Sequence, residues 1–237
     1  MRRIGSIRPD AAVYPDLVLG LDRPARPDVT PQPRSVGIGI MAYCGWAFDP
    51  VQGADIYATY LAKMSSFILW LLRQGYHVRL LIGDERDEAA VRDLLRQHGA
   101  ELQAWSAAIT AERTGSLDEV LEQMARTELV VVTRYHHVIA AVMRHVPVIS
   151  LGYSAKNQAA MREVGLQRYC QHVERLDIDR LTRDFRALWD DRHRHAAQLA
   201  HDHARLQGRL EELCRHLADS ELLAPAAAQR SRIVAHA

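Results

Sequence analysis

Short, almost continuous apolar runs alternate with longer segments of helical periodicity along most of the chain. The apolar runs predict buried strands, because a strand covered on both faces carries little polar sequence. These strands are expected at residues 36–42, 77–82, 128–133 and 146–151, with shorter ones at 101–105 and 168–172. Helices are expected between them at residues 54–74, 88–98, 116–126, 135–145 and 157–164, followed by a helix over 178–217. This alternation predicts an α/β fold with a Rossmann-like, doubly wound parallel sheet and a long C-terminal helix.

Helix ends carry their own signals. Gly75, Gly99 and Gly165 each follow a helical segment and are expected to end it. Ser116, with Glu119 three residues later, matches the capping box that begins a helix.

Four regions follow from this pattern. Residues 1–34 contain six of the nine prolines and hold one expected strand, at 13–21, followed by a Pro-rich linker. Residues 35–175 form the Rossmann-like domain, residues 176–219 the long C-terminal helix, and residues 220–237 a flexible tail. A lone strand cannot bury its faces, so it either pairs with the domain or belongs to a sheet outside this chain.

The terminal helix has an apolar seam with heptad-like spacing. Its members are Leu199, Leu206, Leu210, Leu213 and Leu217. The seam needs a partner, which is the body of the domain, a second copy of the chain or another lobe.

Composition narrows the function classes. The 237 residues include 48% hydrophobic residues and carry a formal net charge of +1, which gives no argument for nucleic acid as a partner. The three cysteines are far apart and fit a reducing compartment, and the sequence has neither a signal peptide nor a membrane span, so a cytoplasmic location is expected. Lys63 and Lys156 are the two lysines among 30 basic residues, which draws attention to each.

Candidate chemistry lies in the loops after the fourth and fifth strands, because ligands bind at the carboxyl ends of strands in open parallel sheets. Arg134 and His136 follow the fourth strand at a helix start, and Tyr153 and Lys156 follow the fifth. If these strands are neighbours, the cationic groups converge on a pocket for a phosphate or a carboxylate. His136 is then the expected general acid or base, whereas His137 faces elsewhere and is expected to be packed or solvated.

Other patterns predict less. Gly37 and Gly39 lack the third glycine of a dinucleotide-binding fingerprint, and the cysteines lack zinc spacing. The acidic residues at 84–88 are more typical of a helix start than of a metal site, so no metal is expected.

The segment over residues 130–166 resembles the signature region of the polysaccharide pyruvyl transferase family. The pattern is a strand, R-x-H, a helix, x-P-V-I-x-x-x-Y-x-x-K and a Gly-Leu helix end. Its positions here are Arg134, His136, Pro147, Tyr153, Lys156 and Gly165. The resemblance extends over roughly residues 10–200.

The resemblance implies the C-terminal lobe of a glycosyltransferase B type fold. It implies transfer of pyruvate from phosphoenolpyruvate to two hydroxyls of a sugar, forming a cyclic ketal in cell-surface polysaccharide synthesis. Lys156 and Arg134 would then hold the donor's phosphate and carboxylate, Tyr153 would contact substrate, and His136 would move the proton. No cofactor beyond the donor substrate is implied. The acceptor would be a sugar or a lipid-linked oligosaccharide, handled in the cytoplasm or at the inner face of the membrane.

Members of this family carry a first lobe before the region matched here. Residues 1–34 resemble only the tail of that lobe, a remnant strand and the linker, and the family's R-D-x-x-S motif has no counterpart. Three explanations stay open: a truncated gene product, a misplaced start of the sequence, or one half of a split protein. A second copy or a separate first lobe would bind through the C-terminal helix.

Two alternatives remain open. A nucleotide-sugar-dependent glycosyltransferase would need an acidic contact to the ribose, for which Glu163 is the available candidate. A non-catalytic module would keep the fold and form a dimer through the terminal helix.

Overall fold

The computed structural model describes residues 12–22, 29–45, 50–97 and 99–219. Its sheet has the strand order β3-β2-β1-β4-β5-β6, and every pairing is parallel. The strands are β1 (Ser35–Gly39), β2 (His77–Leu81), β3 (Ile109–Ala111), β4 (Leu129–Val132), β5 (Val148–Gly152) and β6 (Cys170–His172). The order runs outward in both directions from the β1–β4 pair, which confirms the predicted doubly wound parallel sheet.

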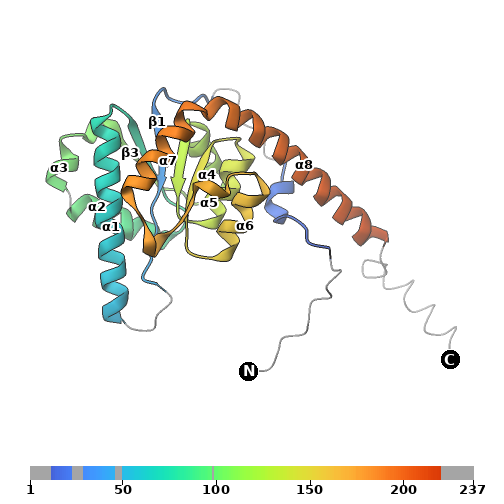
Figure 1. Cartoon of the computed structure of the whole chain (residues 1–237), viewed down its shortest axis with the longest axis horizontal. Coiled ribbons are helices and arrows are strands. Elements are labelled where there is room, and N and C mark those ends of the chain that lie inside the picture. The colour runs from blue at the N-terminus through green and yellow to red at the C-terminus, as the bar shows by residue number, and fades with distance from the viewer. Residues whose placement is uncertain (1–11, 23–28, 46–49, 98, 220–237) are drawn as a thin grey trace. The chain divides into compact units, whose positions relative to one another are not determined.

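Helices cover both faces of the sheet (Figure 1). They are α1 (Pro50–Arg73), α2 (Glu85–Gln97), α3 (Gly99–Gln103), α4 (Leu117–Ala125), α5 (Tyr135–Met143), α6 (Ala155–Glu163), α7 (Ile178–Asp190) and α8 (Arg192–Asp219). One set of packed helices contains α1 and α2, and another contains α4, α5 and α6. Right-handed crossovers that run in opposite directions across the sheet place these two sets on opposite faces.

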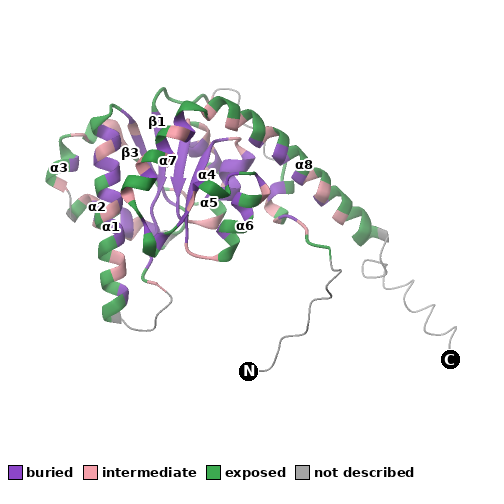
Figure 2. Cartoon of the chain, in the orientation of Figure 1, coloured by how far each residue is buried: buried purple, intermediate pink, exposed green. Residues whose placement is uncertain are grey.

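The central strands are buried at every position, as the purple strands in Figure 2 show. This burial on both faces is the physical reason why β1, β4 and β5 were visible in the sequence as apolar runs. Most helices bury one side and expose the other (Figure 2), whereas α5 is buried at every residue from His137 to Met143.

Three helix boundaries follow the expected signals. Gly75 and Gly165 have φ of 79° and 67° and end α1 and α6 in the left-handed conformation that glycine adopts readily. The Ser116 hydroxyl accepts a hydrogen bond from the Glu119 backbone N–H at 3.3 Å and begins α4. His145, with φ of 56°, ends α5 in the same left-handed conformation without being a glycine.

The strand predicted for residues 101–105 is wrong. Residues 99–103 form the short helix α3, in which Leu102 is the buried side chain. The edge strand β3 lies later and pairs with β2 through Ile109, Thr110 and Ala111. An edge strand of three residues that is only partly buried has too short an apolar run to be predicted from the sequence.

The single long helix predicted over 176–219 is two helices. α7 ends and α8 begins around Asp191, whose carbonyl accepts a hydrogen bond from the His195 N–H at 3.1 Å. The Asp191 carboxylate also pairs with Arg194 at 2.6 Å. The sequence has no glycine or proline at this break, so the helical pattern runs through it unmarked.

The chain divides into two compact units, Arg23–His203 and Met1–Asp22 together with Ala204–Ala237. In the smaller unit, residues 17–20 form a 3-10 turn, η1 (Leu17–Gly20), so the strand predicted at 13–21 is wrong for the described residues. The Asp16 carboxylate accepts from the Val18 N–H at 3.0 Å and caps this turn, which competes with an extended conformation.

Leu210, one member of the apolar seam, lies close to the segment before the linker within the smaller unit. A side chain on Gly20 would lie 3.1 Å from Cδ1 of Leu210, so the segment before the linker approaches the helix closely. The Tyr14 hydroxyl and His216 Nδ1 lie 2.8 Å apart. Residues 23–28 of the predicted linker and the predicted tail at 220–237 lie outside the described residues.

Candidate functional site

The two loops that carry the predicted site are adjacent. β4 and β5 pair directly, with Val132 opposite Ser150, so the loops that follow them leave the same edge of the sheet side by side. Arg134 stands at the start of α5, and Lys156 lies in the first turn of α6. The expectation that these strands are neighbours is therefore confirmed.

Arg134 is held by a carboxylate from a third loop. Its Nε and Nη2 donate to Oδ2 and Oδ1 of Asp87 at 2.9 and 2.8 Å, and Asp87, near the start of α2, is fully buried. Burial alone lowers the pKa of Arg134, but the hydrogen bond and the charge of Asp87 outweigh it, and the pKa is raised. Arg134 is thus a fixed, permanently charged group. From the sequence, Asp87 was expected only as one of the acidic residues at a helix start, not as the partner of Arg134.

Asn157 joins the loops after β4 and β5. Its Nδ2 donates to the Thr133 carbonyl at 3.2 Å and lies 3.4 Å from the Ser150 hydroxyl, and its Oδ1 accepts from the Ser154 hydroxyl at 3.1 Å. The residue is fully buried. A side chain on Gly152 would lie 2.6 Å from Cβ of Asn157, so this close approach requires glycine. The sequence offered no signal for this link.

The loop after β1 is tied to the same edge. The Met41 and Ala42 N–H groups donate to the Tyr60 hydroxyl at 3.4 Å and to Asp87 Oδ1 at 3.3 Å. The Tyr60 hydroxyl also lies 2.9 Å from the Thr133 hydroxyl, and burial raises the pKa of Tyr60 to about 12. Tyr60 therefore stays a neutral phenol and acts as a structural link.

Tyr153 belongs to an aromatic contact beside the site. Its ring lies 5.8 Å from that of Tyr43, whose hydroxyl donates to Oε1 of Glu174 at 2.5 Å. Burial and this hydrogen bond raise the pKa of Tyr43. Burial and Asp87 dominate the pKa of Arg134, and Tyr153 adds a smaller contribution that raises it. Glu174, which follows β6, was not predicted as a site residue.

His136 and Lys156 are the accessible members of the predicted set. Both are exposed, and the His136 ring meets Tyr135 edge-on at 5.5 Å. The Lys156 ammonium makes no hydrogen bond or ion pair with the residues that the structure describes. A ligand at this edge would therefore find an exposed imidazole, an exposed ammonium and the outer side of the Arg134 guanidinium.

His137 is packed, one of the two states expected for it. It is 1% exposed, and a side chain on Gly39 or Gly83 would lie 2.6 Å from its ring nitrogens. Burial lowers the pKa of His137 from 6.5 to about 4, and the charges of Arg134 and His136 act in the same direction. The ring is therefore neutral at neutral pH.

This shift predicts a pH dependence of stability. Between pH 6.5 and 4 the unfolded chain binds a proton at residue 137 that the folded chain does not. The free energy of unfolding should therefore decrease as the pH is lowered from 6.5 to 4, by up to about 3 kcal/mol from this group. Urea unfolding at a series of pH values checks it. His137→Gln should lack this part of the slope, and identical slopes in both proteins would contradict the prediction.

No group of three or more His, Cys, Asp or Glu side chains in the described part of the chain is arranged to hold an ion. Nor does any helix of the described residues have the length and apolar character to cross a membrane.

A hollow of about 530 Å³ lies away from these loops, at the amino ends of β4 and β5. Glu128, Arg192 and Pro147 are among its lining residues. Both carboxylate oxygens of Glu128 are engaged, by Arg192 Nε at 3.0 Å and by the Arg34 N–H at 2.6 Å. None of the predicted site residues lines this hollow, so the carboxyl edge remains the candidate site.

Comparison with known proteins gives one family match. A profile of the family described as polysaccharide pyruvyl transferase matches residues 1–155, which include Arg134, His136 and Tyr153 and end one residue before Lys156. No curated protein matches significantly. Among solved structures, a mutant O-GlcNAc transferase from Thermobaculum terrenum has 18% sequence identity and a TM-score of 0.49. The match covers 86% of this chain and 38% of that one, so the chain spans well under half of the transferase.

Proposed function

Because the chain belongs to the polysaccharide pyruvyl transferase family, we propose that it transfers pyruvate from phosphoenolpyruvate to two hydroxyls of a sugar acceptor. The product is a cyclic ketal on a polysaccharide or a lipid-linked oligosaccharide. The observation that carries this proposal is the placement of Arg134, His136 and Lys156 on the adjacent loops after β4 and β5.

The donor carries two anionic groups, and the site offers two different cations for them. Lys156 is exposed at the start of α6, where helix N–H groups also favour an anion, and it suits the phosphate. Arg134 presents the side of its guanidinium that does not contact Asp87, and it suits the planar carboxylate. Tyr153 stands on the loop after β5, next to the loop that carries Arg134.

The reaction requires proton movement beside bound anions. The oxygen of one sugar hydroxyl bonds to C2 of the donor and releases its proton, while the donor's methylene takes a proton and becomes a methyl group, so this addition consumes and releases one proton each. The bond between C2 and the phosphate oxygen then breaks, the second hydroxyl bonds to C2, and its proton leaves with inorganic phosphate. His136 is the group proposed to move the proton, because histidine exchanges protons readily near neutral pH and this ring is exposed.

Calorimetric titration with phosphoenolpyruvate tests the proposal. Lys156→Ala should weaken binding by about 10- to 100-fold, because a charged hydrogen bond contributes about 1.5–3 kcal/mol. His136→Ala should bind the donor nearly as well as the parent chain, since its role lies in proton transfer.

Arg162 provides the matched control. It is an exposed cation in the last turn of the same helix, α6, away from the strand end. Arg162→Ala should change donor affinity by less than about twofold, since an exposed charge at that distance is largely screened. The proposal would be contradicted if the folded chain binds a nucleoside diphosphate and does not bind phosphoenolpyruvate.

A further inference from the structure

Asp87 makes more contacts at the site than a helix-start carboxylate needs. Oδ1 accepts from Arg134 Nη2 at 2.8 Å and from the Ala42 N–H at 3.3 Å, and Oδ2 accepts from Arg134 Nε at 2.9 Å. Both oxygens are thus used, and the carboxylate is fully buried. Nearby Asp84 differs, because it is 44% exposed and 3.9 Å from Arg134 Nη2.

The contact fixes one side of the guanidinium and leaves the other open. Nε and Nη2 are bound, whereas Nη1 makes no hydrogen bond within the described residues. A planar group held by two bonds on one side cannot rotate, so the direction of its remaining donors is set. Such a fixed donor recognises a planar acceptor better than a mobile cation does.

The same contact changes the charge of the site. The negative charge of Asp87 compensates the positive charge of Arg134. The uncompensated positive charge at this edge therefore rests on Lys156, which has no ion pair with the described residues. A bare phosphate therefore gains from one cation, whereas a ligand with both a phosphate and a carboxylate also gains from the directed donor. The site therefore distinguishes these two ligands by the fixed direction of the Arg134 donor rather than by the total charge of the site.

We propose that Asp87 is a positioning residue that makes this edge select phosphoenolpyruvate over inorganic phosphate by orienting Arg134. The inference rests on the proposed function and names the residue that gives its donor site selectivity. A purely structural Asp87 would affect the two anions alike.

The test compares both anions by calorimetry in the parent chain, in Asp87→Asn and in Asp84→Asn. Asp87→Asn should reduce the preference for phosphoenolpyruvate over inorganic phosphate by about tenfold, the loss of one oriented charged contact. The affinity of Asp87→Asn for inorganic phosphate should rise, because no carboxylate at residue 87 then compensates the charge of Arg134. Asp84→Asn, the matched control, should keep the preference within about twofold, because its carboxylate is exposed and more distant.

A second measurement uses the unaltered chain, so it does not depend on how Asp87→Asn folds. The Arg134 Nε–H signal in a nitrogen–proton NMR spectrum, assigned by its loss in Arg134→Lys, should exchange slowly with water before any donor is added. A fast-exchanging signal would overturn the inference, as would an unchanged anion preference in folded Asp87→Asn. If the parent chain binds no phosphoenolpyruvate, the proposed function fails and this inference fails with it. If the parent chain binds the donor and Asp87→Asn keeps the preference, the inference alone fails.

Discussion

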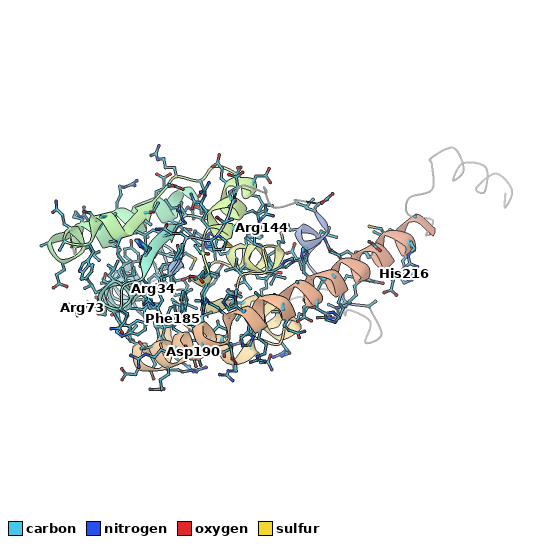
Figure 3. All side chains as sticks on the ribbon, turned by 90° about the horizontal axis from the view of Figure 1, so that it is seen from above. Arg34, Arg73, Arg144, Phe185, Asp190 and His216 are labelled. Carbon is cyan, nitrogen blue, oxygen red and sulfur yellow. The ribbon has the colours of Figure 1, made fainter. Side chains whose placement is uncertain are left out.

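Replacing Phe185 by alanine is expected to lower the free energy of unfolding by about 3–5 kcal/mol, the range for a large aromatic side chain in a core. Phe185, on α7, is completely buried and is labelled in Figure 3. Its ring meets those of Phe67, Trp70 and Tyr76 edge-on at 5.8, 5.6 and 5.3 Å, and it stacks on Trp189 at 5.8 Å. Alanine would remove every one of these contacts and leave a cavity between α7 and α1.

Urea unfolding followed by tryptophan fluorescence measures this loss, because two cluster members are tryptophans. Arg186→Ala is the matched control on the same helix, where Arg186 lies exposed over the Trp70 ring at 5.3 Å. It should cost no more than about 1 kcal/mol, the value of an exposed cation–π contact. A loss below about 1.5 kcal/mol in Phe185→Ala would contradict the packing of Phe185 between α7 and α1, since core truncations cost more.

The sheet was predictable because burial on both faces leaves an apolar run in the sequence, as in β4 and β5. The adjacency of the Arg134 and Lys156 loops was predictable for a similar reason, since consecutive strands joined by a helix are commonly neighbours. Neither inference required knowledge of side-chain contacts.

The partners of those residues were not predictable. Asp87 is 47 positions from Arg134 in sequence and follows a different strand, so only the folded sheet brings the carboxylate and the guanidinium together. A pattern can place an acidic residue at a helix start, but the same pattern serves a solvated helix start and a buried ion pair. The turn at Asp191 was hidden for a related reason, because its local hydrogen bonds leave no glycine or proline to mark it.

Replacing Arg134 by alanine is expected to cost about 3 kcal/mol of stability, the lower end of the range for breaking a buried ion pair. The expected cost arises at Asp87, which is fully buried and would lose donors at 2.8 and 2.9 Å. The lower end applies because the Arg134 side chain is 23% exposed, so part of its charge is already solvated. The measurement is urea unfolding at neutral pH.

Arg92→Ala is the control, because Arg92 is 67% exposed and pairs with Glu88 on α2 at 3.5 Å. It should cost about 0.5 kcal/mol or less, as exposed pairs within one helix do. The double variant Arg134→Ala/Asp87→Asn should lose less than the sum of the single losses, because removing the carboxylate's charge removes the main penalty of leaving it unpaired. Equal stability of Arg134→Ala and Arg92→Ala would mean that Asp87 does not need its partner. Arg134 would then not be held in place, and the selectivity inferred for the donor site would lose its physical basis.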